Sequence, residues 1–182
     1  GSVRDALLGR LGNDLDFTTP ARPEVVKEIL DEWAETVWDT GIDFGTVSAA
    51  YKGQQIEITT FRSDSYDGQS RNPEVVYGDT LEGDLVRRDF KANAMAIELL
   101  ADASFKFHDP LHGLQDIADR VLDTPDKPEI SFHDDPLRML RAARFASQLE
   151  FRVADRVVEA MRDMAGEIQR ITCLLYTTPS PR

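Results

Sequence analysis

The spacing of apolar residues changes once along the chain, at Asp109-Pro110, and this change limits the folds that the sequence allows. Before it, segments with the 3.6-residue period of a helix alternate with segments that have the two-residue period of a strand. After it, only helical spacing occurs, around residues 114–120, 135–149 and 154–171. We therefore expect an α/β (α+β) part, with a mixed sheet and flanking helices, followed by an all-helical part.

The first part should begin with a helix, a strand and a second helix, followed by further strands. The expected elements are a short helix over residues 1–11, a strand over 14–18, a helix over 23–35, a hairpin over 44–61 and, within 90–100, a helical turn and one more strand. The predicted buried stripe of the second helix consists of Val25, Val26, Ile29, Leu30 and Trp33. Trp33 and Trp38 are interpreted as core residues. Residues 62–82 are polar and predict a long loop, either functional or disordered.

Charge and composition exclude several classes of protein. The 182 residues include 33 Asp and Glu against 21 Lys and Arg, which gives a net charge of -12. This balance disfavours a protein that coats nucleic acid nonspecifically, although it allows a local basic groove and carboxylate sites for divalent cations. The single cysteine, Cys173, excludes an internal disulfide and a zinc site built from cysteines. No apolar run approaches the roughly 20 residues of a membrane span, and no leader sequence is visible. We therefore expect a cytoplasmic protein without a membrane partner; its oligomeric state stays unknown.

Asp14 and Asp16 alternate along the first predicted strand and therefore lie on one of its faces. Alternate side chains on a strand are about 6 to 7 Å apart, so this pair could bracket Mg²⁺ ions. Glu57, which faces away from Ile56 and Ile58, could add a third carboxylate. The alternatives are two surface aspartates on an edge strand and an exposed strand glutamate.

Gly1 and Ser2 head the helix that directly precedes this strand. Free backbone N–H groups at a helix N-terminus bind phosphate, and Arg4 adds a guanidinium group for phosphate oxygens. An anion-binding helix end beside a cation-binding strand suits a nucleoside triphosphate with magnesium. The alternative is a plain amphipathic surface helix with a glycine left from a cloning site.

Four blocks of charged and glycine-containing sequence follow one another along the chain. They are Gly1-Ser2-Val3-Arg4-Asp5 with Leu8-Gly9 and Asp14-Leu15-Asp16-Phe17; Arg87-Arg88-Asp89-Phe90-x-x-Asn93-Ala94; Asp109-Pro110-x-x-Gly113-x-x-Asp116; and Asp134-Asp135-Pro136-Leu137-Arg138-x-x-Arg141-Ala142-x-Arg144-Phe145. In this order they resemble the signatures of class II CCA-adding tRNA nucleotidyltransferases and bacterial poly(A) polymerases. The first glycine of the family's Gly-Gly pair is missing, and Asp134 stands where the family usually has Glu.

The resemblance covers about residues 1–172 and implies two domains. Residues 1–109 would form a catalytic nucleotidyltransferase head of the DNA polymerase β type, and residues 110–172 a truncated helical neck that selects the nucleotide. Residues 173–182 look like the translation of a sequencing adapter and are expected to be non-native; the alternative is a natural flexible tail.

The resemblance also implies a reaction, namely template-independent transfer of CMP and AMP from CTP and ATP to a tRNA 3′ end. Asp14 and Asp16 would hold the Mg²⁺ ions of two-metal-ion catalysis. The implied nucleotide-binding residues are Gly1, Arg4, Arg88, Asp89, Asp135, Arg138, Arg141 and Arg144. Asn93 lies close to this set, and Arg71, in the long loop, could approach the substrate. Arg141 and Arg144 could equally form a solvated basic stripe, and the loop could be inert.

Asp135 and Arg138 are three residues apart on the predicted helix and should therefore share a face. A carboxylate can accept a hydrogen bond from the amino group of cytosine or adenine while a guanidinium donates to the adjacent ring nitrogen. Guanine and uracil present the opposite order and would leave buried groups unpaired, at a cost of ~1–3 kcal/mol per group. Such a pair would select C and A without a template. The alternative is a surface ion pair in which the aspartate caps the helix.

Two other functions stay open at this point. Poly(A) polymerases and enzymes that add only CC or only A share these blocks, and a noncatalytic RNA-binding fragment would use the acidic pair structurally. The family's body and tail regions, which hold the tRNA, are absent from this sequence, so the fragment itself is expected to act poorly on tRNA. No role is assigned to His108, His112 or His133.

Overall fold

The computed structural model of the chain describes residues 1–65 and 74–171. Arg71 and residues 173–182, on which the sequence analysis made predictions, lie outside the described residues. Within the described residues no helix is both long and apolar enough to cross a membrane.

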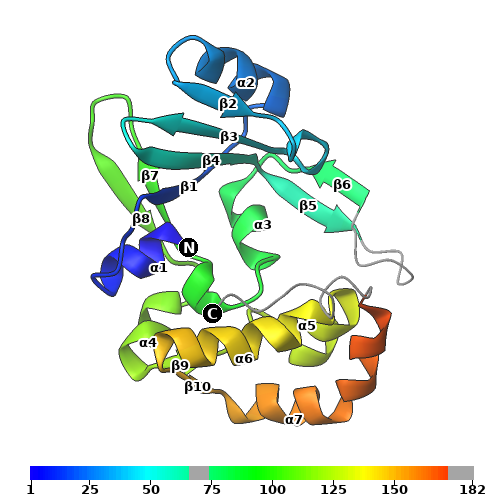
Figure 1. Ribbon diagram of the computed structural model, residues 1–182. Coiled ribbons are helices and arrows are strands. Elements are labelled where there is room, and N and C mark those ends of the chain that lie inside the picture. Colours follow the sequence, from blue (N-terminus) through cyan, green and yellow to red (C-terminus); the bar gives the residue numbers. More distant parts are fainter. Residues whose placement is uncertain (66–73, 172–182) are drawn as a thin grey trace.

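The central sheet contains β1 (Asp14–Thr19), β4 (Gln54–Thr60), β3 (Thr46–Tyr51) and β2 (Thr36–Trp38), in that order (Figure 1). β1 runs parallel to β4, and the other neighbouring strands are antiparallel. The short helix α1 (Ser2–Leu7) precedes β1, and the 3₁₀ turn η1 (Ile42–Phe44) precedes β3. The predicted mixed sheet with helices is therefore confirmed.

Helix α2 (Pro23–Asp31) covers one face of the sheet, but only part of its predicted apolar stripe is buried. Val26 and Leu30 are 5% and 1% exposed, whereas Val25 and Ile29 are 46% and 53% exposed. The prediction of burial was wrong for Val25 and Ile29. Residues four positions apart follow one line along a helix, and only the line of Val26 and Leu30 meets the sheet.

The prediction that both tryptophans are core residues was also wrong, since Trp33 and Trp38 are each 43% exposed. Trp33 lies beyond the end of α2 and contacts the ring of Tyr51 edge-on, with 5.0 Å between the ring centroids. Trp38 lies on β2, the edge strand of the sheet. An edge position leaves even a large apolar side chain in contact with water.

The segment 62–82, predicted as a loop, contains regular structure at both ends. β5 (Arg62–Ser65) pairs antiparallel with β6 (Glu74–Tyr77), and α3 (Leu81–Val86) follows. The prediction failed here because a strand ladder is made by backbone groups and can form without an apolar side-chain pattern.

The 3₁₀ turn η2 (Lys91–Asn93) and strand β7 (Ala96–Leu99) appear as predicted, and a second strand, β8 (Phe105–His108), pairs with β7. Beyond it lie α4 (Gly113–Asp119), β9 (Val121–Leu122), α5 (Pro128–Asp134), α6 (Leu137–Leu149), β10 (Arg152–Val153), α7 (Asp155–Asp163) and the 3₁₀ segment η3 (Ala165–Arg170). This part is therefore mainly helical but not all-helical, because β9 and β10 form a short parallel pair.

The largest apolar core lies under the junction between the sheet-containing part and the helical part. Its buried members are Phe90, Ala92, Met95, Ile117, Leu122, Ala142, Phe145, Leu149 and Phe151. Two smaller cores lie under α2 and between α5, α6 and α7. At the edge of the junction, Arg10 donates a 2.9 Å hydrogen bond to the carbonyl oxygen of Gln148, which ties the segment after α1 to the end of α6.

Replacing Leu30 with alanine should lower the free energy of unfolding by about 2–5 kcal/mol, because it leaves a cavity against the sheet. Replacing its exposed neighbour Ile29 with alanine should change that free energy by less than about 0.5 kcal/mol. Urea denaturation of both variants measures the difference. Equal losses would contradict the orientation of α2 described above.

Candidate active site

One cavity of about 790 Å³ gathers residues that are distant in the sequence. Apart from Arg71, every residue that the sequence analysis assigned to the site lines it. They are Gly1, Arg4, Asp14, Asp16, Glu57, Arg88, Asp89, Asn93, Asp135, Arg138, Arg141 and Arg144. Figure 1 shows the sheet strands β1 and β4 on one side of this region and α6 on the other.

The cavity is lined by side chains of both charges. Asp14 and Asp16 lie on β1, and Glu57, on the neighbouring strand β4, is paired in register with Asp16. The cavity is also lined by arginines, namely Arg4, Arg62, Arg87, Arg88, Arg138, Arg141 and Arg144. These arginines share the cavity with the carboxylates of Asp5, Asp14, Asp16, Glu57, Asp89 and Asp135, so the cavity offers contacts to an anion as well as to a cation.

The carboxylate of Asp16 is held by Ser2, the first residue of α1. The Ser2 backbone N–H and hydroxyl donate to Asp16 Oδ2 at 3.2 and 3.3 Å. A Cβ atom added to Gly1 would lie 2.5 Å from Asp16 Oδ2, so a larger residue at position 1 would displace this carboxylate.

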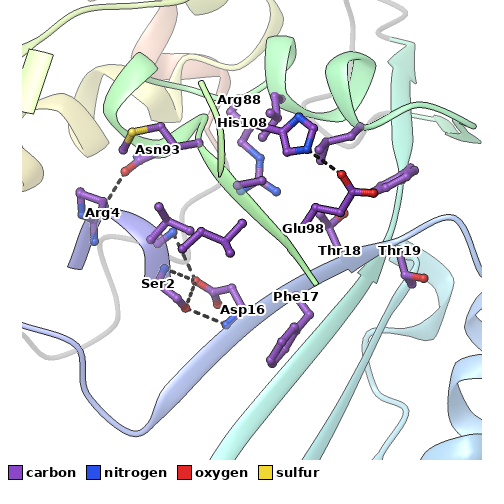
Figure 2. A pocket seen from close by; sticks show the side chains of 18 of the residues that line it. Ser2, Arg4, Asp16, Phe17, Thr18, Thr19, Arg88, Asn93, Glu98 and His108 are labelled. Atoms are coloured by element: carbon purple, nitrogen blue, oxygen red, sulfur yellow. Dashed lines mark hydrogen bonds and ion pairs between the residues drawn. The ribbon is translucent and has the colours of Figure 1, made fainter. Parts of the chain in front are cut away.

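Asp16 also borders a second cavity, of about 850 Å³, which Figure 2 shows. The second cavity shares Ser2, Arg4, Arg88 and Asn93 with the first, among others, and extends toward α3 and the hairpin of β7 and β8. On that hairpin His108, to which no role was assigned, bonds to Glu98 at 2.8 Å. Asp16 therefore stands on the wall that the two cavities have in common.

A largely buried chain of hydrogen bonds connects four residues that line the first cavity. Arg4, which is 8% exposed, donates from Nη1 to Asn93 Oδ1 at 2.5 Å. Asn93 Nδ2 donates to Asp89 Oδ1 at 2.9 Å, and Arg141 Nε donates to Asp89 Oδ2 at 2.7 Å. Each of these polar groups is thereby satisfied by the protein itself, as burial requires. The network connects α1, η2 and α6.

Asp84, on α3, lines neither cavity but pairs with Arg87 and Arg88, which line the first one, and the sequence analysis missed it. Its side chain is fully buried and accepts hydrogen bonds from Arg87 and Arg88, each at 2.9 Å. Burial alone would raise the pKa of Asp84, but the two guanidinium groups hold it below its ordinary value. Asp84 precedes Arg87 by three residues and Arg88 by four, which are the spacings at which ion pairs form on a helix. This spacing could have identified Asp84 from the sequence.

Asp135 and Arg138 both line the cavity, but the prediction that they share a helix face was wrong. Asp135 has extended backbone angles, φ -141° and ψ 98°, and α6 begins only at Leu137. The next residue is Pro136, and a residue before proline is driven out of the helical region. Asp135 Oδ1 accepts from the Leu137 backbone N–H at 3.0 Å, so one carboxylate oxygen caps the helix.

Arg138 is held by two partners of its own. It donates to the Ser131 hydroxyl at 2.8 Å and to the Arg87 carbonyl oxygen at 2.9 Å. A guanidinium group has five N–H donors, so these two bonds orient it and leave donors for a ligand.

The third sequence block does not reach the first cavity and instead packs α4 against η2. The Asp109 carboxylate accepts hydrogen bonds from the N–H groups of Gly113 and Leu114 at 2.6 and 3.0 Å. A Cβ atom on Gly113 would collide with the Lys91 carbonyl oxygen, so glycine is required there. Burial is the main cause that raises the pKa of Asp116 to about 6.

Within the described residues, no three His, Cys, Asp or Glu side chains are grouped so that they could hold a metal ion by themselves. Asp14 and Asp16 offer oxygen ligands, which hard divalent cations prefer. Mg²⁺ in particular is usually held by one or two carboxylates together with substrate phosphates and waters. The carboxylates present therefore fit a divalent cation that binds together with a polyphosphate.

The chain is similar to known proteins in sequence and in structure. The family model described as "Poly A polymerase head domain" matches residues 1–123. The CCA-adding enzyme of Lactobacillus helveticus (strain DPC 4571) is 41% identical over 173 residues, which cover 94% of this chain and 41% of that protein. The chain thus spans about two fifths of the length of the curated relatives it matches.

Two solved structures are similar over almost the whole chain. The Bacillus stearothermophilus CCA-adding enzyme in complex with CTP matches with a TM-score of 0.80 and 36% identity, covering 94% of this chain and 40% of that one. A tRNA nucleotidyltransferase complexed with a primer tRNA and an incoming ATP analog matches with a TM-score of 0.75 and 32% identity, covering 91% and 45%.

Replacing Asp84 with asparagine should weaken the acid dependence of stability. Because the pKa of Asp84 is lowered in the folded state, its contribution is present above the unfolded-state value of about 3.9 and is lost as the pH falls. The wild type should therefore lose stability more steeply than the variant below about pH 4. At pH 7 the variant should be less stable by about 1.5–3 kcal/mol, because the charge of Asp84 that pairs with Arg87 and Arg88 is lost. Urea denaturation at several pH values measures both effects; parallel curves would contradict them.

Proposed function

Since the chain belongs to the poly(A) polymerase head-domain family, we propose that it is the catalytic part of an enzyme that adds CMP and AMP, from CTP and ATP, to the 3′ end of tRNA. Its fold is that of the nucleotidyltransferase head of the DNA polymerase β type. In this proposal residues 1–109 are the head and residues 110–172 the nucleotide-selecting neck.

A single observation carries the proposal, namely that one cavity contains both the carboxylates of β1 and seven arginines. A nucleoside triphosphate that binds together with a cation needs acidic groups for the cation and basic groups for the phosphates, close enough for one ligand to contact both. The relatives named as CCA-adding enzymes, and the similar structures with CTP and with a primer tRNA, support the same substrates. The proposal places this activity in the cytoplasm.

Asp14 and Asp16 would bind the divalent cations that enzymes of this kind use, and we propose Mg²⁺. The metal would supply activation of the attacking 3′-hydroxyl and stabilisation of the leaving pyrophosphate. The protein's own groups bind and orient the nucleotide. The backbone around Gly1 and the guanidinium of Arg4 lie near the phosphates, and Arg88 and Asp89 position the sugar. Arg141 and Arg144 orient the incoming nucleotide from the neck.

Asp135 and Arg138 would select the base. The Leu137 N–H occupies one carboxylate oxygen of Asp135, and the other oxygen accepts from the amino group of cytosine or adenine. Arg138 donates to the adjacent ring nitrogen from a position fixed by Ser131 and the Arg87 carbonyl. Glu57 and Asn93 would act on other residues of the site. Glu57 is paired in register with Asp16, and Asn93 accepts a hydrogen bond from Arg4.

A poly(A) polymerase is the second candidate, because the matching family model carries that description and an Asp/Arg pair also accepts adenine alone. Enzymes that add only CC or only A would use the same groups. A noncatalytic RNA-binding fragment would not need the carboxylates of β1, which gives the first test below.

The double substitution Asp14→Ala with Asp16→Ala should lower nucleotide incorporation by at least about 100-fold, since it removes the groups that hold the cation. The assay measures incorporation of labelled CTP and ATP, with GTP and UTP as controls, into tRNA lacking its 3′ end, with and without Mg²⁺. It uses the full-length product of the gene. Incorporation of A alone by the wild type would favour the poly(A) or A-adding alternative. No incorporation by a folded wild type would leave the binding fragment as the better account.

Replacing Asp135 with alanine should reduce the preference for C and A over G and U by about 10-fold or more, because one half of the base-reading pair is lost. Asp134→Ala is the matched control, since Asp134 is adjacent in sequence but does not line the cavity. Competition between the four nucleotides in the same assay measures the preference. Similar losses in the two variants would argue against base reading by Asp135.

A further inference from the structure

The ring of Phe145, on α6, is surrounded by three guanidinium groups. The central guanidinium carbons of Arg4, Arg141 and Arg144 lie 5.0, 5.2 and 4.9 Å from the centroid of the ring. All three distances are within the roughly 6 Å over which a cation is attracted to an aromatic face. Phe145 and its three arginines all line the first cavity.

Neighbouring core residues hold the ring of Phe145 in place. Phe145 is 7% exposed and belongs to the core under the junction of the two parts of the chain. Phe90, which is fully buried, meets it edge-on, with 5.9 Å between the ring centroids. An aromatic ring packed in this way has little freedom to turn, so it can act as a rigid support for the groups over it.

The three arginines differ in their other partners. Arg4 is paired with Asp5 through two hydrogen bonds of 2.8 Å, and Arg141 is paired with Asp89. For Arg144 the described residues show the ring of Phe145 as a partner and no carboxylate. No carboxylate among the described residues therefore offsets the charge of Arg144 or occupies its N–H donors, and the ring of Phe145 is the contact that positions it.

An aromatic support suits an anion-binding arginine better than a carboxylate does. A carboxylate would neutralise the guanidinium and would compete with an incoming anion for the same N–H groups. The face of a ring attracts the cation without taking its donors, which stay available for bidentate contact with phosphate oxygens.

We propose that Phe145 is a positioning residue for polyphosphate binding: its ring holds Arg144, beside Arg4 and Arg141, so that the donors of Arg144 meet the phosphates of a nucleoside triphosphate in the cavity. The ligand class rests on the function proposed above. Phe145 acts through the arginines and takes no part in the chemical step.

The test compares Phe145→Leu with Phe151→Leu. Phe151 is 5% exposed and belongs to the same core, and no described arginine lies over its ring, so both variants lose a similar amount of core packing. Titration calorimetry with CTP and with inorganic tripolyphosphate measures affinity, and urea denaturation measures stability. We expect both variants to lose stability, but only Phe145→Leu to bind both anions about fivefold or more weakly. Phe145→Tyr should restore most of the affinity because it restores the ring.

A second comparison does not depend on the stability of the leucine variant. Arg144→Gln should weaken tripolyphosphate binding in the wild type and should have a clearly smaller effect when residue 145 is methionine, which fills the space without an aromatic face. Equal effects in the two backgrounds would overturn the proposal, as would equal weakening by Phe145→Leu and Phe151→Leu.

Failure of this inference can be told from failure of the proposed function. If the wild type binds neither CTP nor tripolyphosphate, the proposed function fails and this inference fails with it. If the wild type binds both anions but Phe145→Leu behaves as Phe151→Leu does, only the inference is overturned.

Discussion

A short chain of hydrogen bonds, from Arg4 through Asn93 and Asp89 to Arg141, holds the site together. It joins the first helix, the turn after α3 and the long helix α6, which lie far apart in the sequence. Because these groups are mostly removed from water, loss of any one of them leaves its neighbours without a partner, and that is costly. The positions of the β1 carboxylates relative to the arginines of α6 therefore depend on this chain.

The sequence predicted which residues lie together around the cavity, and most of this prediction came from the resemblance of its four ordered blocks to a known family. The two-residue alternation of Asp14 and Asp16 required a strand, and β1 is that strand. The ordered blocks of arginine and aspartate named nearly all the residues that line the cavity. What the blocks share is a charge pattern, and this pattern can be read without knowing the packing.

The errors arose where the outcome depended on a neighbour in space or on one local restriction. Helical spacing showed that α2 has an apolar stripe but could not show that Val26 and Leu30, rather than Val25 and Ile29, meet the sheet. Pro136 keeps Asp135 out of the helix. Asp135 and Arg138 have the three-residue spacing of a helix, and the sequence analysis therefore placed both on one helix face. Asp84 was missed because the sequence analysis did not ask which carboxylate pairs with Arg87 and Arg88.

The contact between Arg10 and Gln148 has a consequence for synthesis of the protein. The segment after α1 leaves the ribosome 138 residues before its partner, and Arg4 leaves it 89 residues before Asn93. At about 5–20 residues per second, the first of these intervals is on the order of ten seconds. Throughout that time the nascent chain carries the β1 carboxylates without the arginines of α6. A growing chain therefore cannot form the complete cavity until α6 has emerged.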